Sequence, residues 1–263
     1  MRELKMNTLN IKNSLTVDKL SSGYEKKPVI KGLSFQLKQG EILGVIGSNG
    51  AGKTTLLKTI MGIIPYDQGS IFMGESDLKE DPFVAKKNIA YIPEVPILYG
   101  EMTLREHMEF TAMAHEITEE QYESRSAYLL KKFRMEGKLE HFPNTFSKGM
   151  RQKVMVMNAL LYDPRIYIVD EPFIGLDPKA IEDFLRLIEE KRRKGASILM
   201  STHVLDTAEK ICDRFLLLDE GEILAYGSLE DIREKASLHG SSLREIYHRL
   251  SGSSFEDLEG WDE

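Results

Sequence analysis

Short apolar runs separated by polar turns dominate the first fifty residues. Apolar stretches suited to strands lie at 15–23 and 29–38, and a polar segment ending in Pro28 separates them. The run Glu41–Ile46 is almost continuously apolar and ends at Gly47, which is typical of a buried strand in a parallel sheet. The pattern therefore predicts two strands followed by a core strand of an α/β domain.

From Pro93 to about Leu161 the spacing of apolar residues becomes helical. Thr103 and Thr118 each stand three residues before a Glu or Gln, which is the pattern of a capping box at a helix start. Behind the second box, one helical face is predicted to consist of Tyr122, Ser126, Leu129, Leu130 and Phe133. We therefore expect a helical insert, at about residues 95–161, between two halves of the α/β core.

Strand-type sequence returns after the insert. Apolar runs predict four further strands, at 166–169, 197–200, 214–218 and 223–226. Between the first two, Asp177 is predicted to cap a helix that has Pro178 at its first position and ends at Gly195. The buried stripe of this helix is predicted to be Ile181, Phe184, Leu185 and Ile188.

After Gly227 the chain becomes helical and charged. From Glu256 onward it carries acidic residues and no basic one, which is typical of a solvated tail. We therefore divide the chain into one domain over residues 1–227 and a C-terminal helical extension with an acidic tail over residues 228–263.

Composition narrows the class of protein. A hydrophobic fraction of 41% is enough for a sizeable core in a chain of 263 residues. The net charge of −7 argues against a nucleic-acid partner, because phosphate backbones need a basic face. One cysteine, Cys212, cannot form an internal disulfide; it fits a reducing cytoplasm and is expected to be a partly buried small side chain.

The sequence contains no membrane-spanning pattern. No stretch approaches the roughly 18 consecutive apolar residues that such a helix needs. Residues 1–14 are mixed polar and lack the apolar region of a secretory signal. If the protein works at a membrane, we expect a partner to hold it there.

The segment Gly47–Thr54 reads GSNGAGKT and matches the phosphate-binding loop pattern G-x-x-x-x-G-K-[ST]. Its glycines let backbone N–H groups turn toward phosphates, and the helix predicted to follow, Lys53–Met61, adds a partial positive charge. Lys53 would reach the β- and γ-phosphates, and the Thr54 hydroxyl would ligate Mg²⁺. The residues assigned to nucleotide binding here are Gly47, Ser48, Asn49, Gly50, Ala51, Gly52, Lys53, Thr54 and Thr55.

A second motif lies at the end of the strand predicted over 166–169, where Asp170 and Glu171 follow each other. Asp170 can hold Mg²⁺, usually through water, and Glu171 can orient and activate the water that attacks the γ-phosphate. An apolar strand followed by Asp-Glu is common by itself, so the pair gains its weight from the phosphate loop upstream.

Between these two motifs, Phe146–Lys153 reads FSKGMRQK, which resembles the signature motif L-S-G-G-Q of the ATP-binding cassette (ABC) ATPases. Downstream, Gly175-Leu176-Asp177 resembles their D-loop, and Ser201-Thr202-His203 resembles the segment of their switch histidine.

Two single residues extend the resemblance. Tyr24 matches the aromatic residue that stacks on adenine, and Glu94 takes the place of the Q-loop glutamine. The motifs follow one another in the family's order over residues 15–227. In local detail the chain most resembles the EcsA-type ATPase subunits of bacterial two-component exporters.

The resemblance implies how the residues act. ATP and Mg²⁺ would be the cofactors, with Thr54, Glu94 and Asp170 at the metal and Lys53, Glu171 and His203 in catalysis. Two copies of the chain would form a head-to-tail dimer that sandwiches two ATP molecules. In it, Ser147 and Gly149 of one subunit would cap the γ-phosphate held by the other, and Asp177 would lie at the nucleotide.

Three positions depart from the family pattern. Lys148 replaces the first glycine of the signature and Met150 replaces its glutamine, but Ser147 and Gly149 are kept, so we expect function to survive. Glu94 replaces glutamine, and an ionised carboxylate can ligate Mg²⁺ or water but cannot donate a hydrogen bond.

Alternatives to a transporter subunit stay open. A soluble ABC ATPase could act on the ribosome or on DNA, but such relatives usually carry two cassettes or long coiled-coil insertions, and neither is visible here. An unrelated P-loop kinase or GTPase would give no reason for Ser147 and His203. A non-hydrolysing module is disfavoured because Lys53, Asp170, Glu171 and His203 are all present.

Taken together, the sequence predicts an α/β fold: a P-loop NTPase (RecA-like) core with an antiparallel β subdomain and an α-helical insert subdomain. The predicted function is the ATP-hydrolysing subunit of an ABC transporter, with export favoured by the subfamily resemblance. The predicted partners are a polytopic membrane permease and a second copy of the chain, without nucleic acid. The predicted location is the cytoplasmic face of the cell membrane, through the permease.

Overall fold

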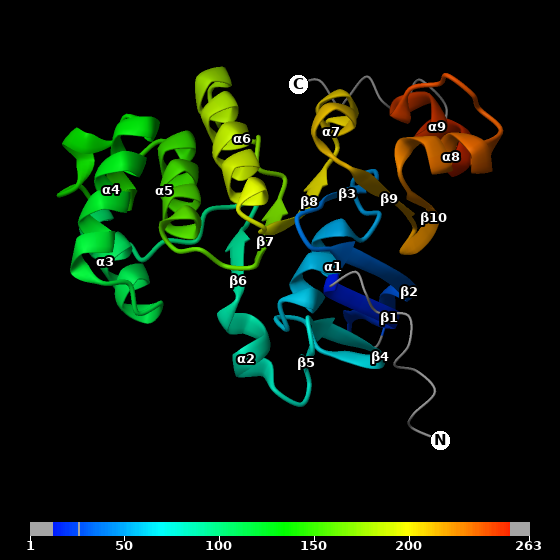
Figure 1. Ribbon diagram of the computed structural model, residues 1–263, viewed down its shortest axis with the longest axis horizontal. Coiled ribbons are helices and arrows are strands. Elements are labelled where there is room, and N and C mark those ends of the chain that lie inside the picture. The colour runs from blue at the N-terminus through cyan, green and yellow to red at the C-terminus, as the bar shows by residue number, and fades with distance from the viewer. Residues whose placement is uncertain (1–12, 26, 253–263) are drawn as a thin grey trace. The chain divides into compact units, whose positions relative to one another are not determined.

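The computed structural model describes residues 13–25 and 27–252 and is drawn as a ribbon in Figure 1. It divides into two units. Unit 1 combines the chain up to Lys86 with the chain from Ser197 onward, and unit 2 consists of Lys87–Ala196. The acidic tail predicted from Glu256 lies outside the described residues.

Unit 1 contains an antiparallel sheet with the strand order β2-β1-β4-β5. Its strands are β1 (Asn13–Tyr24), β2 (Lys27–Lys38), β4 (Tyr66–Met73) and β5 (Ser76–Asp77). The predictions for β1 and β2 are confirmed, whereas the sequence pattern did not assign β4. The first half of β4, at Asp67, Gln68 and Gly69, is polar or exposed and so lacks the alternation that reveals a half-buried strand.

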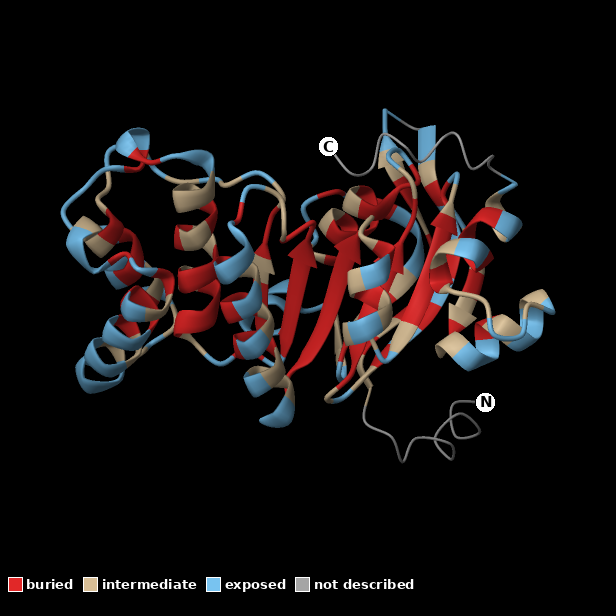
Figure 2. Cartoon of the chain, turned by 90° about the horizontal axis from the view of Figure 1, so that it is seen from above, coloured by how far each residue is buried: buried red, intermediate tan, exposed pale blue. Residues whose placement is uncertain are grey.

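The remaining strands of unit 1 surround β3 (Ile42–Ile46), which runs parallel to β8 (Ser197–Thr202) and to β9 (Arg214–Asp219). Strand β10 (Glu222–Gly227) pairs antiparallel with β9. Every residue of β3 and β8 is buried, as expected for parallel strands covered on both faces, and Figure 2 shows such strands in red. These four predicted strands are confirmed.

The helices of unit 1 are α1 (Lys53–Ile60), α7 (Leu205–Ile211), α8 (Leu229–Ala236) and α9 (Leu243–Ser251); α2 (Pro82–Lys87) runs to its boundary. The two C-terminal helices, α8 and α9, belong to the core of the unit. Their apolar residues Ile232, Leu243, Ile246 and Tyr247 form one buried cluster with residues of β3, α7, β9 and β10. The extension proposed over residues 228–263 thus contributes to packing around the central strands.

Unit 2 contains the helical insert and the strand and helix that follow it along the chain. Its helices are α3 (Leu104–Ala114), α4 (Glu119–Phe133), α5 (Lys148–Leu161) and α6 (Pro178–Arg193), with short 3-10 turns at Glu136–Lys138 and Pro143–Thr145. Its strands β6 (Ile89–Ile92) and β7 (Ile166–Asp170) are parallel. Capping boxes at Thr103 and Thr118 confirm the predicted starts of α3 and α4.

The buried face of α4 agrees with the prediction, whereas the buried face of α6 is rotated about the helix axis. On α4, Ser126, Leu129, Leu130 and Phe133 are buried, and Tyr122 is half-buried. On α6, Asp177 caps the start as predicted, and Phe184 and Ile188 are buried. The α6 stripe is turned, however, so that Asp183 and Leu187 are buried where Ile181 and Leu185 were expected.

In the described part of the chain, no helix is both long and apolar enough to span a bilayer.

Candidate functional site

The predicted phosphate loop connects β3 to α1 in unit 1. Gly50 and Gly52 have φ values of +88° and +103°, a region that residues with a side chain avoid. Gly47 passes so close to β9 that a Cβ on it would lie 2.5 Å from the carbonyl oxygen of Leu218. The glycines of the motif are therefore required by the path of the backbone.

The start of α1 differs from the other long helices of the molecule. Serine, threonine or aspartate side chains accept backbone hydrogen bonds at the starts of α3, α4, α5, α6, α8 and α9. Helix α1 has Gly52 as its N-cap and no side-chain cap. Since the first N–H groups of a helix have no intrahelical partner, this end suits an anion such as a phosphate.

Lys53 lies at the first position of α1 and is buried, with 7% of its surface exposed. Its Nζ donates to the carbonyl oxygens of Gly47, at 2.7 Å, and Ser48, at 3.1 Å. The ammonium group is thus held across the loop. Thr54 is half-buried and Thr55 is buried, while Asn49 and Gly50 are exposed at the tip and Ala51 is buried.

His203 follows the last residue of β8, and the loop follows the last residue of β3. Because the two strands are parallel and Ile46 pairs with Thr202, His203 and Gly47 leave the sheet at the same edge. The Val204 N–H donates to Thr202 Oγ1, at 3.0 Å, as the chain turns toward α7. The structure thus brings the switch-histidine position beside the phosphate loop, which is the edge where ligands bind in open α/β sheets.

Tyr24 ends β1 in unit 1, and 52% of its surface is exposed. An exposed aromatic ring of this size is available for stacking on a flat ligand such as adenine.

In unit 2, β7 places Asp170 and Glu171 at its end. Both are buried, at 1% and 6% exposure. Carboxylates are rarely this buried unless they pair with cations, accept hydrogen bonds or bind a metal. Glu171 also has a φ of +44°, a left-handed conformation that costs about 1–3 kcal/mol in non-glycine residues and is concentrated at functional sites.

The signature segment of unit 2 begins α5. Ser147 is exposed and caps the helix, since its Oγ accepts from the Met150 N–H. Gly149 touches the predicted D-loop: a Cβ on it would lie 2.3 Å from the carbonyl oxygen of Gly175. The structure therefore brings the signature and D-loop motifs into contact within one unit.

Asp177 joins the same two segments. Its Oδ1 accepts from the Ala180 N–H at 2.9 Å, and its Oδ2 accepts from Lys153 Nζ of α5 at 2.8 Å. The hydrogen bond from Lys153, with that from Ala180, holds the pKa of the Asp177 carboxyl below its usual range. Asp177 is thus ionised at neutral pH and fastens the D-loop to the signature helix.

One contact near the predicted site residues could not be read from the sequence patterns. Gln152 of α5 is fully buried, and its Nε2 donates to the carbonyl oxygen of Pro93 at 3.1 Å. The half-buried Glu94 follows directly, so the signature helix is tied to the Glu94 loop. The available signal was a glutamine on the otherwise apolar face of the predicted helix.

The predicted residues are thus divided between the units. Unit 1 holds Tyr24, Gly47, Ser48, Asn49, Gly50, Ala51, Gly52, Lys53, Thr54, Thr55 and His203; unit 2 holds Glu94, Ser147, Gly149, Asp170, Glu171 and Asp177. Among the described residues, no group of three or more His, Cys, Asp or Glu side chains forms a metal site. Mg²⁺ is usually held by one or two carboxylates together with phosphates, so the buried carboxylate of Asp170 suits a Mg²⁺ ion that arrives with a nucleotide.

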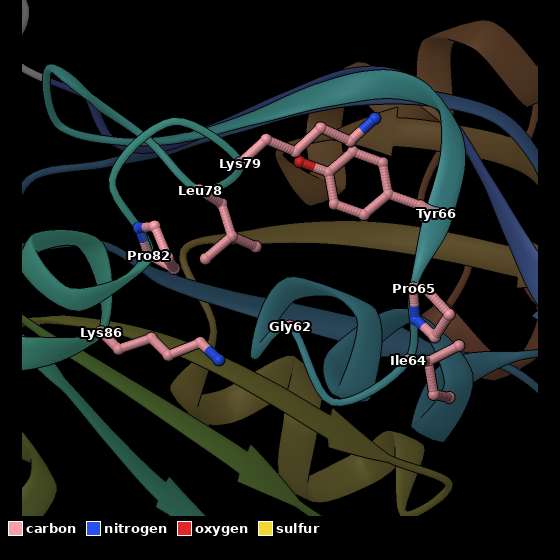
Figure 3. A pocket seen from close by; sticks show the side chains of 8 residues that line it. All are labelled: Gly62, Ile64, Pro65, Tyr66, Leu78, Lys79, Pro82 and Lys86. Carbon is pink, nitrogen blue, oxygen red and sulfur yellow. The ribbon is translucent and has the colours of Figure 1, made fainter.

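Unit 1 also contains a cavity of about 220 Å³ that no sequence motif predicts. Figure 3 shows its lining, which consists of Gly62, Ile64, Pro65, Tyr66, Leu78, Lys79, Pro82 and Lys86. Lys79 Nζ lies 4.2 Å from the centre of the Tyr66 ring. None of the predicted site residues lines this cavity.

Cys212 is partly exposed, as expected, and its Sγ packs on Gly44 of β3, where a Cβ would lie 2.9 Å away. Burial raises the pKa of the thiol, which keeps it protonated. No chemical role is assigned to it.

Comparisons with known proteins agree with this arrangement. A family model described as ABC transporter matches residues 30–174. The chain is 47% identical over 237 residues to the ABC-type transporter ATP-binding protein EcsA of Bacillus subtilis, a match that covers 90% of this chain and 96% of EcsA.

Two further matches extend the comparison. The chain is 30% identical over 222 residues to the lipopolysaccharide export system ATP-binding protein LptB of Escherichia coli, covering 83% of this chain and 92% of LptB. A solved structure described as an ATP-binding subunit of an ABC transporter superposes with a TM-score of 0.87 at 46% identity, covering 90% of this chain and 98% of that chain. The similarity therefore extends far beyond the phosphate loop.

Proposed function

The chain belongs to the ABC transporter family, as the ATP-binding and ATP-hydrolysing subunit of a transporter, and we propose that it powers an exporter. In this proposal two copies of the chain form a dimer with ATP bound between them. The predicted resemblance to EcsA-type subunits and the predicted α/β P-loop fold are confirmed. The observation that carries nucleotide binding is the α1 start, which follows the glycine loop and has no side-chain cap.

Within one subunit, each motif has a separate task. Lys53 and the loop N–H groups bind the β- and γ-phosphates, and the exposed ring of Tyr24 stacks on adenine. Thr54, Asp170 and Glu94 would hold Mg²⁺, which would neutralise phosphate charge there. Glu171 orients the attacking water and accepts its proton, and His203 contacts the γ-phosphate from the edge it shares with Gly47.

The dimer is required because the signature residues act on the other copy's nucleotide. Ser147 is exposed at the start of α5, where its hydroxyl and the helix N-terminus can meet an anion. Gly149 beside it is fixed against the D-loop, which also carries Asp177. ATP binding closes the pair and hydrolysis opens it, because the closed state has the higher affinity for ATP.

An apolar surface on the insert is the proposed contact with the permease. We call it the insert patch and define it as Val95, Ile97, Tyr99, Phe110 and Met113, all exposed. Within it, Tyr99 packs edge-on against Phe110 of α3 at 6.4 Å, and the Tyr99 N–H donates to His107 Nε2 of the same helix. Exposed apolar patches of this kind mark interaction sites.

The insert patch also lies next to the Glu94 loop in sequence. Glu94 precedes Val95, and Gln152 ties the Glu94 loop to the signature helix α5. Movement of α5 is therefore passed to the patch, and from there to a membrane-spanning partner at the cytoplasmic face of the cell membrane.

Export rather than import is proposed from the relatives, since LptB is named as part of an export system. Relatives named as transporter subunits, together with a net charge of −7, disfavour the alternative of a ribosome- or DNA-acting ATPase.

The direct test is purification of the tagged full-length chain from detergent-solubilised membranes of its own cells. A polytopic membrane protein is expected in stoichiometric amount, and reconstitution of that complex should show ATP-dependent turnover that requires Mg²⁺. Recovery of ribosomes or DNA in its place would overturn the transporter assignment.

A further inference from the structure

The phosphate loop is held from outside by the C-terminal helix α9. The backbone N–H of Ser48 donates to the hydroxyl oxygen of Tyr247 at 2.8 Å, across 199 positions of sequence. The Tyr247 hydroxyl in turn donates a hydrogen bond to the carbonyl oxygen of Leu218, at 3.5 Å. A side chain from the last described helix thus occupies a backbone hydrogen-bonding group of the nucleotide-binding loop.

The ring that carries this hydroxyl is fixed in place. Tyr247 is 1% exposed and packs in one cluster with Ile46, Leu217, Leu243 and Ile246. Ile46 directly precedes Gly47, so the Tyr247 ring belongs to the same buried cluster as the end of the strand from which the loop begins. Burial raises the pKa of Tyr247, which keeps the hydroxyl protonated and able to donate to Leu218.

Helix α9 is itself anchored at its start. Ser242 and Glu245 form a capping box, and the Leu243 N–H donates to Glu209 Oε2 of α7 at 2.8 Å. These contacts fix the rotation of the helix and so direct Tyr247 toward the loop.

Ser48 is held at both of its backbone groups. Tyr247 accepts its N–H, and Lys53 Nζ donates to its carbonyl oxygen at 3.1 Å. On the other side of the loop, the Gly221 N–H donates to the Ala51 carbonyl oxygen at 3.1 Å. Loss of the Tyr247 contact would release the N–H of a residue whose carbonyl oxygen, like that of Gly47, accepts from the Lys53 ammonium group.

We propose that Tyr247 is a positioning residue of the ATPase site: by accepting the Ser48 N–H it holds the phosphate loop in its nucleotide-binding conformation, so that ATP affinity depends on the docking of α9. The inference rests on nucleotide binding at the Gly47–Thr54 loop and makes the C-terminal extension part of that site. Tyr247 acts through Ser48 and Lys53, without contact with ATP.

The test is Tyr247→Phe in the full-length chain, which removes the hydroxyl and keeps the packed ring. Loss of one hydrogen bond is expected to weaken MgATP binding, and to raise the KM for ATP, by about three- to tenfold. The kcat at saturating ATP should change less than twofold, because the groups that carry the chemistry are intact. Hydrogen exchange of a peptide covering residues 47–52 should become faster.

Tyr226→Phe is the matched control. The Tyr226 hydroxyl also bonds backbone groups in unit 1, since it accepts the Gln36 N–H at 3.0 Å and donates to the Gln36 carbonyl oxygen, but on β2 and away from the phosphate loop. This variant should lose a similar amount of thermal stability, while its KM for ATP and the exchange of residues 47–52 stay at wild-type values.

A positioning role is overturned if Tyr247→Phe keeps wild-type ATP affinity, or if both variants raise the KM equally in step with their loss of stability. Calorimetry with MgATP distinguishes a failure of the proposed nucleotide binding from a failure of the role assigned to Tyr247. If the wild-type chain does not bind MgATP, nucleotide binding itself fails; if it binds and Tyr247→Phe binds equally well, only the role of Tyr247 fails.

Discussion

Gly149 and Gly175 meet so closely that no side chain fits between them: a Cβ at position 149 would lie 2.3 Å from the Gly175 carbonyl oxygen. The signature helix and the D-loop are therefore in backbone contact. This contact gives the signature glycine a structural task in its own subunit, in addition to the proposed contact with the partner's nucleotide.

The first prediction concerns this contact. Gly149→Ala forces the D-loop or the helix start to move, at a cost of about 1–3 kcal/mol for overpacking. Because Ser147 and Asp177 move with these segments, ATPase activity should fall by about ten- to a hundredfold. Gly137→Ala is the control, since a Cβ there meets nothing within 4 Å. Comparable activity in the two variants would show that the close approach is unimportant.

The second prediction concerns the proposed general base. Glu171→Gln keeps the size of the side chain but cannot accept a proton, so turnover should fall by about 100-fold or more. The variant should still bind MgATP and should dimerise with it, which size-exclusion chromatography with and without nucleotide measures. Glu190→Gln, on the exposed face of α6, serves as control. Wild-type turnover in Glu171→Gln would remove Glu171 from its role.

The third prediction concerns adenine. Tyr24→Ala should weaken ATP binding by about 1–3 kcal/mol, the usual worth of an aromatic ring stacked on a base. Since the side chain is exposed, the melting temperature should stay close to that of the wild type. Calorimetry with MgATP measures the change, and Phe83→Ala, another exposed aromatic residue of unit 1, is the control. Equal affinities in the two variants would argue against stacking on Tyr24.

The fourth prediction concerns the insert patch. Ile97→Asp and Met113→Asp place a charge on a surface proposed to be apolar and dry in the complex, at a cost of about 2 kcal/mol or more each if they lie at its centre. Co-purification of the permease should decrease, while the ATPase activity of the separate subunit is retained. Tyr128→Asp, on α4, tests whether any exposed apolar residue of the insert gives the same result; if it does, the patch has no special role.

Local patterns were sufficient for most elements of the fold. The strand around Ile168, the caps at Thr103, Thr118 and Asp177, and the helix after the phosphate loop depend on the nearest few residues, and the structure has them where the sequence predicts. What depends on packing could not be read in this way. The periodicity of α6 fits several adjacent faces, and only contacts with other elements select the one that buries Asp183 and Leu187.

The candidate site also combines features that local patterns predict with contacts that they do not. The motifs identify the residues that we propose to surround the phosphates, because short chemical patterns specify them. The contacts that hold those residues join distant segments, as Tyr247 does with Ser48 and Gln152 with Pro93. A hydrogen bond between a side chain and a remote backbone group leaves no periodic trace in the sequence, so neither contact was predictable.

The bare start of helix α1 has a consequence for inhibition by product. A helix end completed by the β-phosphate is completed equally well by ATP and by ADP, since both carry that group. The helix start by itself therefore does not distinguish ATP from ADP. Discrimination has to come from groups that detect the third phosphate. In the proposed dimer these are Lys53 and His203 of one copy and Ser147 of the second copy, so a solitary subunit, which lacks the second copy's serine, should be more readily inhibited by ADP.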